Sequence, residues 1–295
     1  MKKAVIDLGT NTFNLAIAEI VNGKINLLHS EKEGVAIGMG GINENRLSED
    51  AIERAVICLK RFKEKCDEFE VVEIKAIGTS AIRDAKNNSE FAQKAQFETG
   101  ISIQIIDGIQ EANYIYKGIA YTYNFETPSL IMDIGGGSTE FIAADKNGVH
   151  DLISLNVGVS RIFQLYEFSD PMTASDIQKV VAFLDANEHD FFSRVNCQTL
   201  VGASGSFETF YELVHHEKYP LGYETQELDF EQFKLTLENI IQSTQAERDT
   251  NVFIIPIRKK MAPIAAIKTR WVIQKMNANK VVISPCSLKE GVLVE

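Results

Sequence analysis

Long apolar runs are missing from this 295-residue sequence, since none approaches the roughly 18 residues that a membrane-spanning helix needs. The start, Met1-Lys2-Lys3, leads into a short apolar segment that already contains Asp7, and no small-residue cleavage site follows. A secretory signal has a longer apolar stretch and such a site. We therefore expect no membrane partner and no secretory signal.

Cysteine is scarce as well, and its positions are scattered. The four cysteines are Cys58, Cys66, Cys197 and Cys286, and no pair has the close spacing of a zinc knuckle. Reduced thiols are therefore more plausible than a disulfide framework, and a cytoplasmic location fits best.

Basic residues are outnumbered. Lysine and arginine total 30 against 41 acidic residues, which gives a formal net charge of −11. Nucleic-acid binding needs a basic surface for the phosphates, so we expect no nucleic-acid partner. The rest of the composition, 45% hydrophobic and 24% charged, is ordinary for a globular protein of one large or two medium domains.

The most informative stretch runs from Ile131 to Phe141 and reads IMDIGGGSTEF. The apolar run at 130–132 predicts a buried strand that ends at Asp133. The polar turn that follows contains Gly135, Gly136, Gly137, Ser138, Thr139 and Glu140. Free N–H groups in such a turn form a concave site for phosphate, hydroxyls add donors, and the two carboxylates suit Mg²⁺. The alternative is a plain hairpin turn.

A similar unit stands near the N-terminus. The apolar segment at 4–8 brings Asp7 to a strand end, and another predicted strand begins at Phe13. The turn between them contains Gly9, Thr10, Asn11 and Thr12. Two strand–turn–strand units at half-chain spacing predict two duplicated lobes that face one cleft.

Other polar residues also follow predicted strands. Arg83 could bind a phosphate, although an exposed arginine paired with Asp84 fits equally well. Glu111 could orient a water, although sequence alone favours a charge that stabilises a helix start. The Gly/Ser turn at 202–206 could hold a nucleotide or distal phosphate, or be a simple connection. Long helices are predicted at 171–192 and 257–276.

These segments together resemble a known family. The paired turns are similar to the two phosphate loops of the acetate and sugar kinase, heat-shock-70 and actin superfamily. More narrowly, the chain resembles the exopolyphosphatase and guanosine pentaphosphate phosphatase family. The segments that carry this resemblance are DLGTNTFNL at 7–15, GTSAIRDAKN at 78–87, GIQEANYIYKG at 108–118, DIGGGSTEF at 133–141, SLNVGVSRI at 154–162, GASGS at 202–206 and SPCSLKEGVL at 284–293.

The resemblance implies an α/β fold with two actin-like, ribonuclease-H-like lobes flanking a catalytic cleft. It implies that Glu111 orients or deprotonates the attacking water, that Arg83 neutralises charge on the transferred phosphoryl, and that Glu140 assists. Asp133, with Asp7, would hold Mg²⁺. The phosphate ligands would be Thr10, Asn11, Thr12, Gly135, Gly136, Gly137, Ser138 and Thr139.

We expect a first lobe at 1–125, a second at 126–285, and a closing helix at 286–295 that packs back on the first. The longer family members continue into a helical region after the position where this sequence stops. We therefore expect terminal phosphates to be released from polyphosphate or guanosine pentaphosphate distributively. A homodimer could supply a longer binding path.

Two other functions compete with hydrolysis. A kinase of the same superfamily would use the same turns, and a non-catalytic alarmone or nucleotide sensor would bind without turnover. The presence of Glu111 in its GIQEANYIYKG context favours hydrolysis over both.

Overall fold

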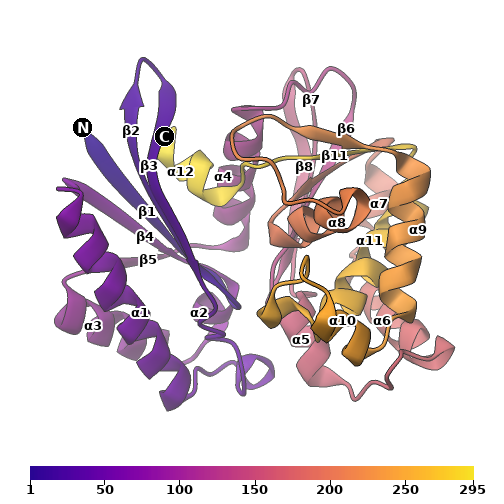
Figure 1. Ribbon diagram of the computed structural model, residues 1–295, viewed down its shortest axis with the longest axis horizontal. Helices are drawn as coiled ribbons and strands as arrows, with labels where there is room; N and C mark the ends of the chain where they lie inside the picture. The colour runs from indigo at the N-terminus through magenta and orange to yellow at the C-terminus, as the bar shows by residue number, and fades with distance from the viewer.

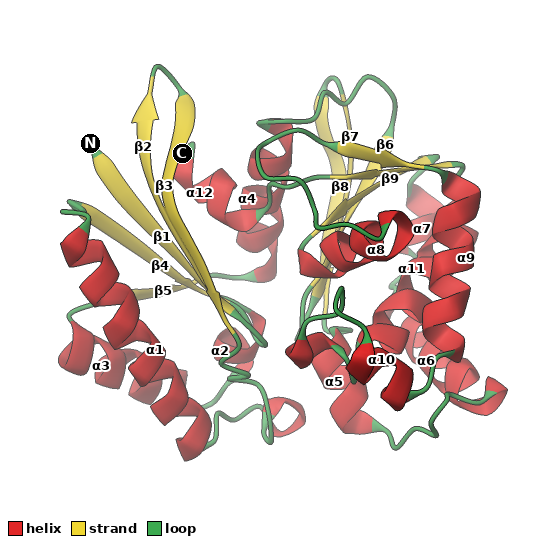
Figure 2. Cartoon of the chain, viewed as in Figure 1, coloured by secondary structure: helices red, strands yellow, loops and turns green.

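The computed structural model describes residues 1–295 and contains two β-sheets, one from each half of the chain (Figures 1 and 2). The first sheet has the order β3-β2-β1-β4-β5. Its first three strands are antiparallel neighbours, and β4 and β5 continue it in parallel. The strands are β1 (Lys2–Leu8), β2 (Phe13–Val21), β3 (Lys24–Glu33), β4 (Glu73–Gly78) and β5 (Ile103–Ile105).

The second sheet repeats this arrangement, with one strand added. Its order is β10-β11-β9-β6-β7-β8, in which β6, β7 and β8 form the antiparallel meander and β9 and β11 continue in parallel. The strands are β6 (Ser129–Ile134), β7 (Thr139–Asp145), β8 (Gly148–Leu155), β9 (Thr199–Ala203), β10 (Gln226–Leu228) and β11 (Lys280–Ile283). The predicted duplication is therefore a duplication of sheet topology.

Helices cover the sheets. Those of the first half are η1 (Ile42–Glu44), α1 (Glu49–Glu68), α2 (Ser80–Asp84), α3 (Asn88–Thr99) and α4 (Gly108–Ala120). Those that follow are α5 (Val159–Leu165), α6 (Ala174–Asn187), α7 (Phe191–Arg194), α8 (Gly205–His215), α9 (Phe230–Gln242), α10 (Gln245–Thr250), η2 (Pro256–Arg258), α11 (Ala262–Met276) and α12 (Leu288–Leu293). None of these helices is long and apolar enough to cross a membrane.

Helices α4 and α12 lie between the two sheets (Figure 1). A Cβ atom on Gly118 would stand 1.9 Å from the Ser287 carbonyl oxygen, and one on Gly291 would stand 1.8 Å from the Tyr114 carbonyl oxygen. Only glycine permits backbones to approach this closely. Apolar side chains from both sheets pack with α4 and α12 into one buried cluster, which joins the two halves.

Two predicted helices are shorter than the sequence indicated. The helix expected over 171–192 divides into α6 and α7, because His189 and Asp190 adopt left-handed backbone angles between them. The helix expected over 257–276 begins only at Ala262, with Pro263 in its first turn, where proline is tolerated. The domain boundary near 125 stays a prediction.

Candidate active site

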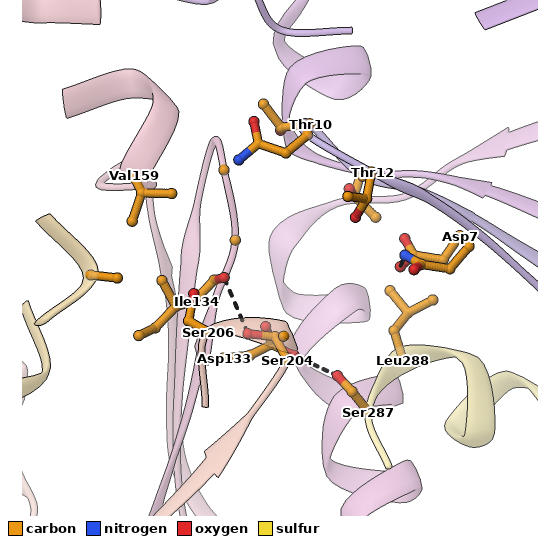
Figure 3. Close-up of a pocket in the computed structure, with 18 of the residues that line it drawn as sticks. Asp7, Thr10, Thr12, Asp133, Ile134, Val159, Ser204, Ser206, Ser287 and Leu288 are labelled. Atoms are coloured by element: carbon orange, nitrogen blue, oxygen red, sulfur yellow. Dashed lines mark hydrogen bonds between the residues drawn. The ribbon is translucent and has the colours of Figure 1, made fainter. Parts of the chain in front are cut away.

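One cavity is lined by residues of both halves of the chain (Figure 3). Figure 3 shows Asp7, Thr10 and Thr12 on one side, with Asp133 and Ser204 facing them. The predicted site residues that line the cavity are Asp7, Thr10, Asn11, Thr12, Glu111, Asp133, Gly135, Gly136, Gly137, Ser138 and Glu140. The fold therefore brings together eleven of the thirteen residues that the sequence singled out.

The two polar turns touch each other across this cavity. A Cβ atom on Gly136 would lie 2.8 Å from the Asn11 side chain, and one on Gly137 would lie 2.8 Å from Thr10 Oγ1. The Ser160 hydroxyl donates a hydrogen bond to Asn11 Oδ1 and links the turns further. The glycines are thus required by the close approach of one turn to the other.

In each turn the backbone carbonyl groups accept hydrogen bonds from other backbone groups, whereas the backbone N–H groups have no backbone partner. The carbonyls of 135–137 accept hydrogen bonds from the N–H groups of 158–161, and those of 10–12 accept from Gly38, Ala36 and Gly9. The N–H groups of 10–12 and 135–138 donate to no backbone carbonyl. Buried N–H groups require a partner, and clustered free ones form an anion site. Both turns are therefore prepared to bind anionic oxygens.

Glu111 is buried in the first turn of α4, just after the Asp107 side chain caps that helix. Its Oε2 accepts a hydrogen bond of 2.6 Å from Arg83 Nη1. Burial raises the pKa of Glu111 well above its ordinary value, the Glu140 carboxylate raises it further, and Arg83 opposes both. A raised pKa makes the ionised carboxylate a stronger proton acceptor than an ordinary glutamate, as a general base requires.

Arg83 does not line the cavity. Its guanidinium binds Glu111, donates to the Ile106 carbonyl at 3.3 Å, and lies 3.7 Å from Asp84. The guanidinium therefore pairs with the candidate base. The role of Arg83 in neutralising charge on the transferred phosphoryl stays a prediction.

Three further carboxyl groups share the cavity with Glu111. Burial raises the pKa of Asp7 to about 6, and the Lys289 ammonium opposes this rise. Burial, followed by the charge of Asp133, raises the pKa of Glu140 to about 7. The pKa of Asp133 is also raised by burial, although the Ser287 hydroxyl donates a hydrogen bond to its carboxylate. The like charges are close enough to repel one another.

Thr139 also lies outside the cavity. It is fully buried, its hydroxyl donates to the Ser138 carbonyl, and it accepts a hydrogen bond from Lys268 Nζ. Thr139 is the first residue of β7, and side chains alternate between the two faces of a strand. Since Glu140 faces the cavity, Thr139 faces away from it.

Three cations at the cavity were missed by the sequence analysis. Lys32 comes from β3, Arg258 from η2 and Lys289 from α12. Lys32 Nζ and Arg258 Nη1 lie 3.2 Å and 3.9 Å from the Glu208 carboxylate. Lys289 lies within the SPCSLKEGVL segment at 284–293, whereas Lys32 and Arg258 lie in no motif, and the fold brings all three to one cavity.

Comparison with known proteins identifies the family. The model of the Ppx/GppA phosphatase family matches residues 16–295. This chain belongs to the Ppx/GppA phosphatase family. The match begins just after the first polar turn and includes the second.

Relatives of this Ppx/GppA family chain include solved structures. An exopolyphosphatase from Cytophaga hutchinsonii is 33% identical and has a TM-score of 0.95, over 99% of this chain and 96% of that one. The Aquifex aeolicus PPX-GPPA enzyme is 29% identical with a TM-score of 0.83, over 100% of this chain and 99% of that one. These similarities confirm the expected fold of two actin-like α/β lobes.

A curated relative is longer than this chain. The guanosine-5'-triphosphate,3'-diphosphate pyrophosphatase of Photobacterium profundum is 32% identical over 217 residues, which is 72% of this chain. The match spans 43% of the length of that protein.

The cavity offers hard oxygen ligands for a divalent cation. No group of three or more acidic, histidine or cysteine side chains lies close enough together to hold a metal ion by itself. Asp7 and Asp133 nevertheless face the same cavity. Mg²⁺ commonly takes one or two carboxylates and completes its shell with water and substrate phosphate. The donor set fits a Mg²⁺ ion bound in that way.

Neutralising Glu140 should change the pH dependence of folding stability. Because the pKa of folded Glu140 is raised to about 7 from a reference of 4.5, the folded chain binds more protons than the unfolded chain between these values. Stability then falls as pH rises through this window. Across this window the unfolding free energy of the parent should fall by on the order of 1–3 kcal/mol more than that of Glu140→Gln.

Urea unfolding in EDTA at several pH values measures this difference. Glu126→Gln, at an exposed position, serves as the control and should follow the parent across the window. A constant offset between the parent and Glu140→Gln would show that burial does not raise the pKa of Glu140.

Proposed function

We propose that this chain is a phosphoanhydride hydrolase that releases terminal phosphate from inorganic polyphosphate or guanosine pentaphosphate. The observation that carries the proposal is the pair of polar turns, whose free N–H groups line one cavity with the buried carboxyl group of Glu111. The turns supply anion binding, and Glu111 supplies a base. The names of the Cytophaga and Photobacterium relatives, exopolyphosphatase and pyrophosphatase, support the same reaction class.

The terminal phosphoryl group is bound by the free N–H groups of the two turns and by the hydroxyls of Thr10, Thr12 and Ser138. A water between this group and Glu111 attacks the phosphorus in line with the bridging oxygen. Glu111 accepts the proton of that water as the new P–O bond forms and the bridging P–O bond breaks. The products are orthophosphate and a chain shortened by one phosphate.

Arg83 keeps Glu111 in place for this step. It provides a positive charge next to the carboxylate and therefore opposes the rise in pKa that burial causes. The pKa of Glu111 is therefore lower than it would be without the guanidinium, and the carboxyl group stays ionised at a lower pH. Arg83 acts on the reaction through Glu111.

The remaining phosphates need positive charge, which the chain as a whole does not provide. Lys32, Arg258 and Lys289 place three cations on the cavity wall. Mg²⁺, held by Asp7 and Asp133 together with substrate phosphate oxygens, would neutralise further charge on the substrate. The kinase and sensor alternatives are not favoured, because a buried base faces the phosphate turns. A cytoplasmic location and a homodimer stay predictions.

A comparison of substrates tests the proposal directly. Phosphate release should be measured with long polyphosphate, tripolyphosphate and guanosine pentaphosphate, each with Mg²⁺ and with EDTA. We expect release from at least one of these substrates, loss of release in EDTA, and gradual shortening of the whole long-chain population on a gel. No release from any of them would refute the function, and long chains persisting beside fully degraded ones would refute distributive action.

Replacing Glu111 by glutamine should lower kcat by about 10²–10⁴-fold, the usual effect of losing a general base. Folding should change little, because the side chains are nearly isosteric and glutamine can still accept from Arg83. The exposed neighbour Gln110, changed to alanine, is the control and should retain the parent kcat. A Glu111→Gln enzyme with full kcat would limit Glu111 to a structural charge at the helix start.

Ser80 is a further residue of this site. Its Oγ is buried, has no hydrogen-bond partner and belongs to a side chain that lines the cavity. A buried hydroxyl without a partner is costly unless a ligand satisfies it. We therefore expect this hydroxyl to donate to a substrate phosphate oxygen.

Ser80→Ala should lower kcat/KM by about 10–100-fold, which corresponds to one hydrogen bond to a charged group. Stability should stay within about 0.5 kcal/mol of the parent, because no protein contact is lost. Thr99→Val is the opposite control: its hydroxyl bonds Ala95 away from the cavity, so it should lower stability and leave kcat/KM unchanged. A destabilised Ser80→Ala with normal kinetics would assign Ser80 to the fold.

A further inference from the structure

Lys268 in α11 is fully buried, with 0% of its surface exposed. Its Nζ donates hydrogen bonds of 2.5 Å to Thr139 Oγ1 and to the Val157 carbonyl oxygen. No carboxylate forms an ion pair with the Lys268 ammonium group, and both of its hydrogen-bond partners are neutral. A lysine is almost never fully buried in this way unless a carboxylate pairs with it.

The fold alone does not account for this charge. Neighbouring residues of α11, such as Ile267 and Trp271, belong to the apolar core of the second lobe. Burying an ammonium group without a counter-charge is strongly unfavourable, and an apolar side chain of similar volume would be at least as stable there. A position that sacrifices stability in this way is usually retained for function.

The two partners of Lys268 flank the second phosphate turn. Thr139 directly follows Ser138, whose side chain lines the cavity. Val157 directly precedes the segment at 158–161, whose N–H groups donate hydrogen bonds to the carbonyl oxygens of the glycine turn. The ammonium group therefore joins the two segments that adjoin the glycine turn.

We infer that Lys268 is a positioning residue that holds the glycine turn and supplies positive charge to the bound phosphate from behind. This inference rests on the proposed function, because it assumes that the turn binds phosphate. Low-dielectric surroundings let a buried charge act over several ångströms with little screening by salt. Burial lowers the pKa of Lys268 to about 7, and the Glu140 carboxylate opposes this fall and so favours the charged form of the lysine.

Lys268→Met removes the charge and keeps most of the volume. We expect KM for tripolyphosphate to rise about 10-fold with kcat changed much less, because the lost attraction acts on bound substrate and transition state alike. The melting temperature should stay the same or increase, because an unpaired buried charge has been removed. A purely structural lysine would give the opposite pair: a lower melting temperature and an unchanged KM.

Two further variants separate charge from structure. Thr139→Val removes a hydrogen-bond partner but keeps the lysine, so its KM should rise less than that of Lys268→Met. Thr269→Val changes a buried hydroxyl on the same helix that bonds only Ala265, and should leave KM unchanged. Lys268→Gln repeats the neutralisation with a polar side chain. If both neutral variants fail to fold, the lysine is a folding requirement and the inference is overturned.

Calorimetric binding of inorganic tripolyphosphate in EDTA separates this inference from the proposed function. Parent and variants are compared without turnover, at low and at high salt. Weaker binding to Lys268→Met at both salt concentrations supports the inference, and equal binding overturns it. Binding without any hydrolysis by the parent in Mg²⁺ would instead refute the proposed function and leave the measured contribution of Lys268 to binding intact.

Discussion

Repulsion among buried carboxyl groups governs this site. Asp7, Glu111, Asp133 and Glu140 share one cavity, and burial raises the pKa of each. The other polar groups of the cavity act next to this concentration of negative charge. An anionic substrate would increase it further. The cations on the cavity wall, the free N–H groups of the turns and a divalent metal ion are the means of offsetting that charge.

This arrangement offers an acidic chain a way to bind the proposed acidic substrate. The net charge of −11 concerns the whole surface and mainly affects long-range recruitment. Binding depends on the local field inside the cavity, where Lys32 and Arg258 lie beside Glu208, and Lys289 lies 3.7 Å from Glu290. Local placement of a few cations is therefore more informative about substrate class than the total charge.

The sequence predicted those parts of the site that are encoded locally. Asp7 and Asp133 lie near strand ends and precede glycine turns, so a short window contains the strand, the carboxylate and the turn. The direction of the Thr139 side chain depends on the alternation of β7, which sends Thr139 and Glu140 to opposite faces. Lys32, Arg258 and Lys268 reach the site only through tertiary packing, and no local pattern marks their side chains.

The close packing of α4 against α12 has a consequence for folding. The five strands of the first sheet are complete by Ile105, yet the face of that sheet that carries Val5 and Ile77 is covered with the help of Leu288 and Val292. Contacts over such a long sequence separation are entropically slow to form. During synthesis the part of this face that α12 covers stays exposed until that helix is available. The first lobe is therefore expected to reach its native packing together with the second lobe, and the catalytic cavity forms last.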